Sequence, residues 1–168
     1  AMLGTLMVIR RRRDQMSRSL QTSEERLRMT LKASQQGLYD LNVQTGAIIV
    51  NAEYALMLGH DPETFKETNA SWMARMHPED RPLVLTAYRD YLTGKTDEFC
   101  AEFRQQTRTG QWKWILSMGK LVERDSQDQP LRMLGTFTDI TERRLADEHK
   151  RQAETEKARM LDEAQQAR

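Results

Sequence analysis

The sequence predicts an α+β fold, in which a five-stranded antiparallel sheet carries its helices on one face and is flanked by a helix at each end. Segments that alternate apolar and polar residues come in a group of two and, later, a group of three, and the stretch between them has helical patterning. Residues 142–168 contain neither glycine nor proline, which favours a long helix. An antiparallel sheet with its helices grouped on one face buries the apolar side of each element economically.

The composition fits one globular domain with polar helical extensions. Of the 168 residues, 38% are hydrophobic and 30% are charged, and the formal net charge is only +1. A charge balance this close to neutral gives no indication of nucleic acid as a partner. Cys100 is the single cysteine, which excludes an internal disulfide and a zinc site built from several cysteines.

The N-terminal residues are typical of the cytoplasmic end of a membrane helix. Residues 2–9 are apolar and a run of arginines follows directly, although about 20 apolar residues are needed to span a bilayer. We therefore expect residues 1–21 to be the end of a membrane helix and its juxtamembrane linker, on the cytoplasmic side of the inner membrane. The alternative is a soluble helix with an apolar start. The expected membrane-proximal residues are Arg10, Arg11, Arg12 and Arg13.

Residues 14–34 have helical spacing, with Met16, Leu20 and Leu27 in a narrow apolar seam. The sequence Thr22-Ser-Glu-Glu is a capping box, so a second helix can start there. A single continuous helix is the alternative. We place the central domain at residues 22–141 and a C-terminal signalling helix at residues 142–168.

The central domain begins with a hairpin over residues 37–51, with a turn at Gln44-Thr-Gly. Short helical segments are expected at residues 52–58 and 70–76, and a turn or short helix at residues 61–65. The sequence His77-Pro-Glu-Asp-Arg then opens a longer helix that runs to Leu92, with Pro78 in the first helical position. Three strands follow, ending with residues 133–140.

The last strand passes directly into the C-terminal helix. Asp139 or Thr141 can cap its N-terminus, because a short side-chain oxygen accepts a hydrogen bond from a free amide of the first turn. Farther along, Ala146, Ala153, Met160 and Ala167 recur every seven residues, which is a weak coiled-coil seam. We expect a homodimer through the flanking helices, and a solvated single helix is the alternative.

Four local sequences, in this order, resemble the PAS family. Ser34-Gln-Gln-Gly-Leu-Tyr-Asp-Leu resembles its first strand, and Met76-His-Pro-Glu-Asp-Arg resembles the start of its long helix. Glu102-Phe-Arg, with Gly110 and Trp114, resembles its fourth and fifth elements, and Gly135 with Asp139-Ile-Thr resembles its closing junction. The resemblance covers residues 24–144 and implies the PAS fold, with a pocket between sheet and helices.

Ligand contacts are expected from the inward side chains of that pocket, although such residues are more often simply core. The candidates are Tyr39, Leu41, Ile48, Val50, Met57, Trp72, Phe99 and Phe103. The cofactor is unknown, because no haem or flavin-adduct motif is evident. His77 before Pro78 reads as a helix-start residue, His60 as a loop residue, and Cys100 lacks the Asn-Cys-Arg context of flavin-binding relatives.

No catalytic motif is evident, and His149 lacks the surroundings of a phospho-accepting histidine. The sequence therefore predicts a sensory module rather than an enzyme. It would sense a small ligand or the motion of a membrane helix and pass the signal through Asp139 and Thr141 into the C-terminal helix. The resemblance implies an output domain such as a diguanylate cyclase, a phosphodiesterase or a histidine kinase. The alternative is a ligand-free module for dimerisation or protein interaction.

Overall fold

The computed structural model describes residues 2–166, with side chains described from Met7 to Gln166. Ala167, the last position of the expected seven-residue repeat, therefore lies outside the described residues. The chain divides into two units, with the division between Gln36 and Gly37.

The first unit is one helix, α1 (Met2–Ser34), which ends where Gln35 adopts a positive φ of 51°. The Thr22 hydroxyl donates to the carbonyl of Arg18 one turn earlier, so the helix runs through the expected second start without a break. The single continuous helix was thus the correct alternative. Met16, Leu20 and Leu27 of its seam are all exposed. In the part of the chain that the structure describes, no helix is both long enough and apolar enough to cross a membrane.

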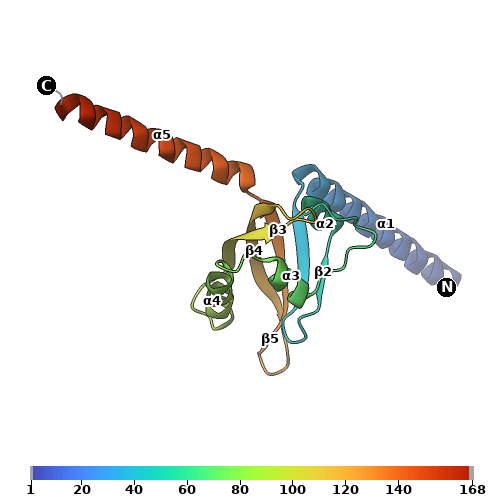
Figure 1. Ribbon diagram of the computed structural model, residues 1–168. Coiled ribbons are helices and arrows are strands. Elements are labelled where there is room, and N and C mark those ends of the chain that lie inside the picture. Colours follow the sequence, from blue (N-terminus) through green and yellow to red (C-terminus); the bar gives the residue numbers. More distant parts are fainter. Residues whose placement is uncertain (1, 167–168) are drawn as a thin grey trace. The chain divides into compact units, whose positions relative to one another are not determined.

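The second unit is built on a five-stranded sheet of order β2-β1-β5-β4-β3, in which every pair of neighbours is antiparallel (Figure 1). The predicted fold class is confirmed. The pairs β1–β2, β3–β4 and β4–β5 are adjacent in sequence, and the last strand, β5, lies between β1 and β4. The strands are β1 (Gly37–Asn42), β2 (Ile48–Val50), β3 (Phe99–Gln106), β4 (Trp112–Arg124) and β5 (Pro130–Asp139).

Three helices connect β2 to β3, namely α2 (Ala52–Met57), α3 (Asn69–Arg75) and α4 (Arg81–Leu92). The Asn51 side chain caps α2 by accepting from Tyr54 N, and it also accepts from Leu38 N of β1. Thr68 forms a reciprocal capping box with Ser71 at the start of α3. Each cap satisfies amides that the first helical turn leaves free.

The predicted start of the long helix was wrong. Residues 78–80 form a turn, and α4 begins at Arg81 with Pro82 in its first turn. Asp80 makes no side-chain cap, because its carboxylate accepts instead from the backbone N–H of Arg104 at 2.7 Å and from the Arg104 guanidinium. A partner from a distant strand therefore decides the helix start.

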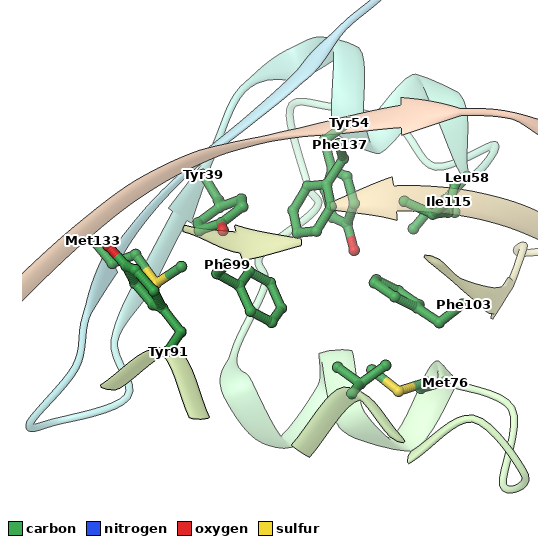
Figure 2. Packing of buried hydrophobic residues seen from close by; sticks show 11 residues of the cluster. Tyr39, Tyr54, Leu58, Met76, Tyr91, Phe99, Phe103, Ile115, Met133 and Phe137 are labelled. Carbon is green, nitrogen blue, oxygen red and sulfur yellow. The ribbon is translucent and has the colours of Figure 1, made fainter. Parts of the chain in front are cut away.

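The core lies between the helices and one face of the sheet (Figure 2). Phe99 and Phe103 of β3, Ile115 of β4 and Phe137 of β5 alternate with outward residues and are almost fully buried. The helices close the core with Tyr54, Leu58, Met76, Val84 and Tyr91. The chain then continues into α5 (Thr141–Gln166), which agrees with the expected C-terminal helix.

Candidate functional site

A small cavity lies between the inner face of the sheet and helices α3 and α4. Its volume is about 80 Å³, which is small beside the roughly 300–1,000 Å³ of sites for drug-sized ligands. It still exceeds the roughly 15 Å³ that one water molecule needs. The space therefore suits a molecule of few heavy atoms.

Five of the eight candidate pocket residues line this cavity: Tyr39, Leu41, Ile48, Trp72 and Phe99. They come from β1, β2, α3 and β3. Figure 2 shows the Tyr39 and Phe99 side chains on the same side of the sheet. Contact of these residues with a ligand stays a prediction.

The other three candidates lie elsewhere. Phe103 is fully buried in the core, with its ring centroid 5.6 Å from that of Trp72. Met57 packs against the core, and Val50 lines a separate open groove beside Leu38 and Leu134. Alternation places all three near the sheet and helices, but it does not say at which end of the core the packing leaves space.

Several cavity residues were missed by the sequence reasoning. Ser117, Met133 and Phe137 are inward positions of β4 and β5, and strand alternation extended to these strands would have found them. Val84 and Tyr88 are one turn apart on α4, so helical spacing carried a signal for them. The remaining lining residues are Asn69, Met73 and Leu85.

The cavity is apolar with a few polar side chains. None of the described residues that line it is charged; the ones with polar side-chain atoms are Tyr39, Asn69, Trp72, Tyr88 and Ser117. Burial raises the pKa of Tyr39 to about 12, so the phenol is neutral at physiological pH. Its hydroxyl lies 3.5 Å from the carbonyl oxygen of Met118. The lining therefore offers hydroxyl groups, the Asn69 amide and the Trp72 indole N–H, and no countercharge.

A buried carboxylate holds α3, and with it Trp72, beside the cavity. The Glu67 side chain is inaccessible to solvent and accepts hydrogen bonds from Tyr54 Oη at 3.0 Å and from the Thr68 amide at 3.1 Å. It also pairs with Ser71 and Arg75 of α3. A buried charge is tolerated when it is paired and hydrogen-bonded, so this network fixes α3 to α2.

The junction between β5 and α5 is hydrogen-bonded to both backbone groups of one β4 residue, Trp114. Ile140 N donates to the carbonyl of Trp114 at 2.9 Å, and Trp114 N donates to Thr141 Oγ1 at 3.0 Å. Thr141 in turn donates from its amide and its hydroxyl to Asp139 Oδ1, at 3.0 and 2.6 Å. Lys113 Nζ lies 2.8 Å from Asp139 Oδ2. Both predicted junction residues thus contact the strand that also lines the cavity.

Partial burial opposes ionisation of Asp139, but hydrogen bonds from Lys113 and Thr141 outweigh it and lower the pKa of this carboxyl. Asp139 is therefore charged at neutral pH. The first turn of α5 is also tied to β3, since Arg143 and Arg144 both pair with Glu102. The Arg144 guanidinium lies 4.5 Å from the centroid of the Trp114 ring.

The histidine and cysteine candidates lie away from the cavity lining. His77 Nδ1 accepts from the Glu79 amide at 3.3 Å, and its ring meets Trp112 edge-on. His60 packs against Phe65. Cys100 is exposed on the outer side of β3. Among the residues that the structure describes, no group of three His, Cys, Asp or Glu side chains could hold a metal ion.

A model of a known family matches this sequence over residues 47–137, and its description is "PAS fold". That match spans more than half of the chain and most of the sheet. The chain belongs to the PAS family.

A curated relative of this PAS domain is a sensor. It is 28% identical over 149 residues to the two-component sensor PprA of Pseudomonas aeruginosa, an alignment that covers 85% of this chain and 15% of PprA. The chain thus spans only a small part of that curated relative.

Among solved structures, the PAS domain resembles a sensory box histidine kinase/response regulator from Burkholderia thailandensis, with a TM-score of 0.69 and 28% identity. That match covers 80% of this chain and 98% of the other. The N-terminal domain of a diguanylate cyclase with a PAS/PAC sensor from Marinobacter aquaeolei gives a TM-score of 0.56 and 25% identity, covering 65% and 98%. The chain is a PAS sensor module of the kind found in histidine kinases and diguanylate cyclases, and no catalytic domain is recognised in it.

Proposed function

We propose that this PAS domain senses a small ligand or the motion of a preceding membrane helix and relays the signal through Asp139, Ile140 and Thr141 into α5. The helix would control an output domain, either a histidine kinase or a diguanylate cyclase or phosphodiesterase. The relatives from Pseudomonas, Burkholderia and Marinobacter are a two-component sensor, a histidine kinase/response regulator and a diguanylate cyclase, which supports the first two of these outputs.

The observation that carries the proposal is the hydrogen bond from Trp114 N to Thr141 Oγ1. Strand β4 contributes Ser117 to the cavity and, three residues earlier, Trp114 to the junction. A shift of β4 that follows ligand binding therefore acts directly on the first residue of α5. Because α5 is a continuous helix, a change of orientation at Thr141 is carried along its length.

The two inputs rest on different parts of the chain. The uncharged lining of the cavity favours a small neutral ligand, since a charged one would lose its hydration without gaining a countercharge. Arg10 to Arg13 are all exposed on α1, which suits contact with anionic headgroups on the cytoplasmic side of the inner membrane. A membrane input would reach the domain through this helix.

Dimerisation is part of the same proposal. Leu145, Met160 and Leu161 of α5 are each more than half exposed. A second copy of α5, packed in parallel along the seam of Ala146, Ala153 and Met160, would bury Met160 and cover the neighbouring Leu145, whereas Leu161 lies off this seam. A homodimer is therefore the expected assembly.

The alternative is a PAS module without a ligand, in which the flanking helices serve dimerisation and relay only. The small size of the cavity favours this ligand-free alternative, because a space of this size can be filled by water alone. Native mass spectrometry of the freshly purified chain, with an absorption spectrum, separates the two readings. Extra mass that is lost on denaturation supports ligand sensing, whereas a bare protein mass is expected for the alternative and for a weakly bound metabolite.

The relay is tested by replacing Asp139 and Thr141 with alanine in the longer protein, or in a fusion of this domain to a histidine kinase core. We expect a folded domain whose output no longer responds to the signal. Glu142→Ala, next to the junction but outside its hydrogen bonds to β4, is the matched control and should respond normally. A double variant with a normal response contradicts the relay.

A further inference from the structure

The Tyr39 ring lies in a space that two glycines leave open on the inner face of the sheet. Tyr39 pairs with Gly135 across β1 and β5, and Gly135 pairs with Gly119 across β5 and β4. A Cβ built on Gly135 would lie 2.2 Å from Tyr39 Cζ, and one built on Gly119 would lie 2.1 Å from Tyr39 Oη. Neither carbon can exist at those distances, so the phenol reaches across β5 to β4 only because both positions are glycine.

A left-handed backbone conformation does not explain these glycines, although a Cβ on Gly135 would also lie 2.3 Å from the Met118 carbonyl oxygen. Both lie within regular antiparallel pairing, and neither has the positive φ found at Gly46 or Gly110. A residue with a side chain would normally strengthen a strand interior, since glycine there loses more conformational entropy. The lack of a side chain at both positions therefore allows the Tyr39 ring to approach the strands closely.

The position of the ring decides the shape and chemistry of the cavity. Tyr39 is 5% exposed and lines the cavity together with Phe99, Ser117 and Tyr88. With the ring flat on the glycines, the space above it stays open and the hydroxyl is held near Ser117. A ring pushed off the sheet would enter that space, because the cavity lies on the same side.

We propose that Tyr39, held flat by Gly119 and Gly135, selects the ligand of this cavity. The ligand class is a neutral molecule of few heavy atoms with an apolar body and one hydrogen-bonding group. The inference rests on the ligand-sensing part of the proposed function.

Each element of this class follows from the lining. The volume of about 80 Å³ limits the size. The uncharged walls reject ions, because a buried charge without a partner is strongly unfavourable. The hydroxyls of Tyr39, Tyr88 and Ser117 can hydrogen-bond one polar group of the ligand. Further polar groups would be buried without a hydrogen bond, which is also unfavourable.

The first experiment measures the coupling between Gly119 and Tyr39 by denaturant unfolding. Gly119→Ala should raise the unfolding equilibrium constant by about 5- to 100-fold, as expected for an overpacked core. Adding Tyr39→Phe removes the atom at 2.1 Å and leaves the ring Cζ at 3.2 Å and the flexible end of Met133, its Cε, at 2.5 Å, so the double variant should recover part of that loss. Met118→Ala, the outward neighbour on β4, is the control for the strand. A Gly119→Ala variant as stable as the wild type, or no recovery in the double variant, overturns the inference.

The second experiment titrates the chain with propan-2-ol and with acetate, which has the same number of heavy atoms but carries a charge, while the methyl resonance of Met133 is followed by NMR. We expect saturable shifts with propan-2-ol and none with acetate. Tyr39→Phe should weaken propan-2-ol binding by about 3- to 10-fold, the effect of one hydrogen bond. Equal binding of both probes, unchanged binding by Tyr39→Phe, or no binding to the wild type overturns the ligand class. The titration tests the ligand class alone. The output assay of the variant at Asp139 and Thr141 tests the relay alone, so failure of one proposal can be told from failure of the other.

Discussion

Replacing Thr141 with valine should weaken the hydrogen-bonded junction between β4 and α5 while keeping the shape of the side chain. Valine keeps the branched side chain and removes the hydroxyl that accepts from Trp114 N at 3.0 Å and donates to Asp139 at 2.6 Å. The Trp114 amide is partly buried, so water replaces the lost acceptor only in part.

A buried donor left without its acceptor costs about 1–3 kcal/mol. Because Thr141 and Trp114 are only half-buried, we expect the lower part of that range, about 1–2 kcal/mol, for the free energy of unfolding. For a domain of this size the melting temperature should fall by roughly 3–10 °C. Hydrogen exchange should accelerate at the Trp114 and Ile140 amides, which form the two bonds of the junction.

Thr141→Ser is the matched control, since it keeps the hydroxyl and loses only a methyl group. It should stay within about 0.5 kcal/mol of the wild type and retain the protection of the Trp114 amide. The reasoning is refuted if Thr141→Val unfolds at the same denaturant concentration as Thr141→Ser, with equal exchange rates at Trp114.

The remaining predictions concern acid stability, the buried carboxylate and the dimer. The Arg104 guanidinium lowers the pKa of Asp80, so the ion pair stabilises the domain above about pH 4 and loses its effect as the pH falls through the lowered pKa. Urea unfolding between pH 3 and 7 should show this loss, and Asp80→Asn should flatten it; an unchanged slope in the variant would contradict the assignment. Glu67→Ala should cost about 3 kcal/mol in chemical unfolding because it removes the acceptor of the buried Tyr54 hydroxyl and the partner of the partly buried Arg75 guanidinium, whereas the exposed Glu63→Ala should cost less than about 0.5 kcal/mol. Ending the chain at Arg144 should lower the mass measured by light scattering from dimer to monomer, and an unchanged mass would move the dimer contact away from α5.

Local periodicity was sufficient for the fold class and for part of the site. Alternation in residues 37–50 placed Tyr39, Leu41 and Ile48 on the inner face, where they line the cavity. The change from strand to helix pattern identified Asp139 and Thr141, both of which take part in the junction with β4. These features depend on side-chain spacing along one segment, and that spacing is visible in the sequence.

Contacts between distant segments decided the rest. Asp80 leaves the start of α4 uncapped because Arg104, from β3, offers it an amide and a guanidinium. Phe103 and Ser117 both face inward, yet only Ser117 meets the cavity, because the helices pack tightly over one end of the sheet and less tightly over the other.

The glycines beside Tyr39 show the same difference between what local sequence reveals and what only contacts between distant segments reveal. In the sequence, Gly119 reads as a weak point in a strand, and only its pairing with Gly135 reveals that it accommodates an aromatic ring from β1. Periodicity along the chain determined which face each residue occupies. Tertiary structure alone decided which residues on that face touch, because strand register and helix packing set distances between residues far apart in sequence.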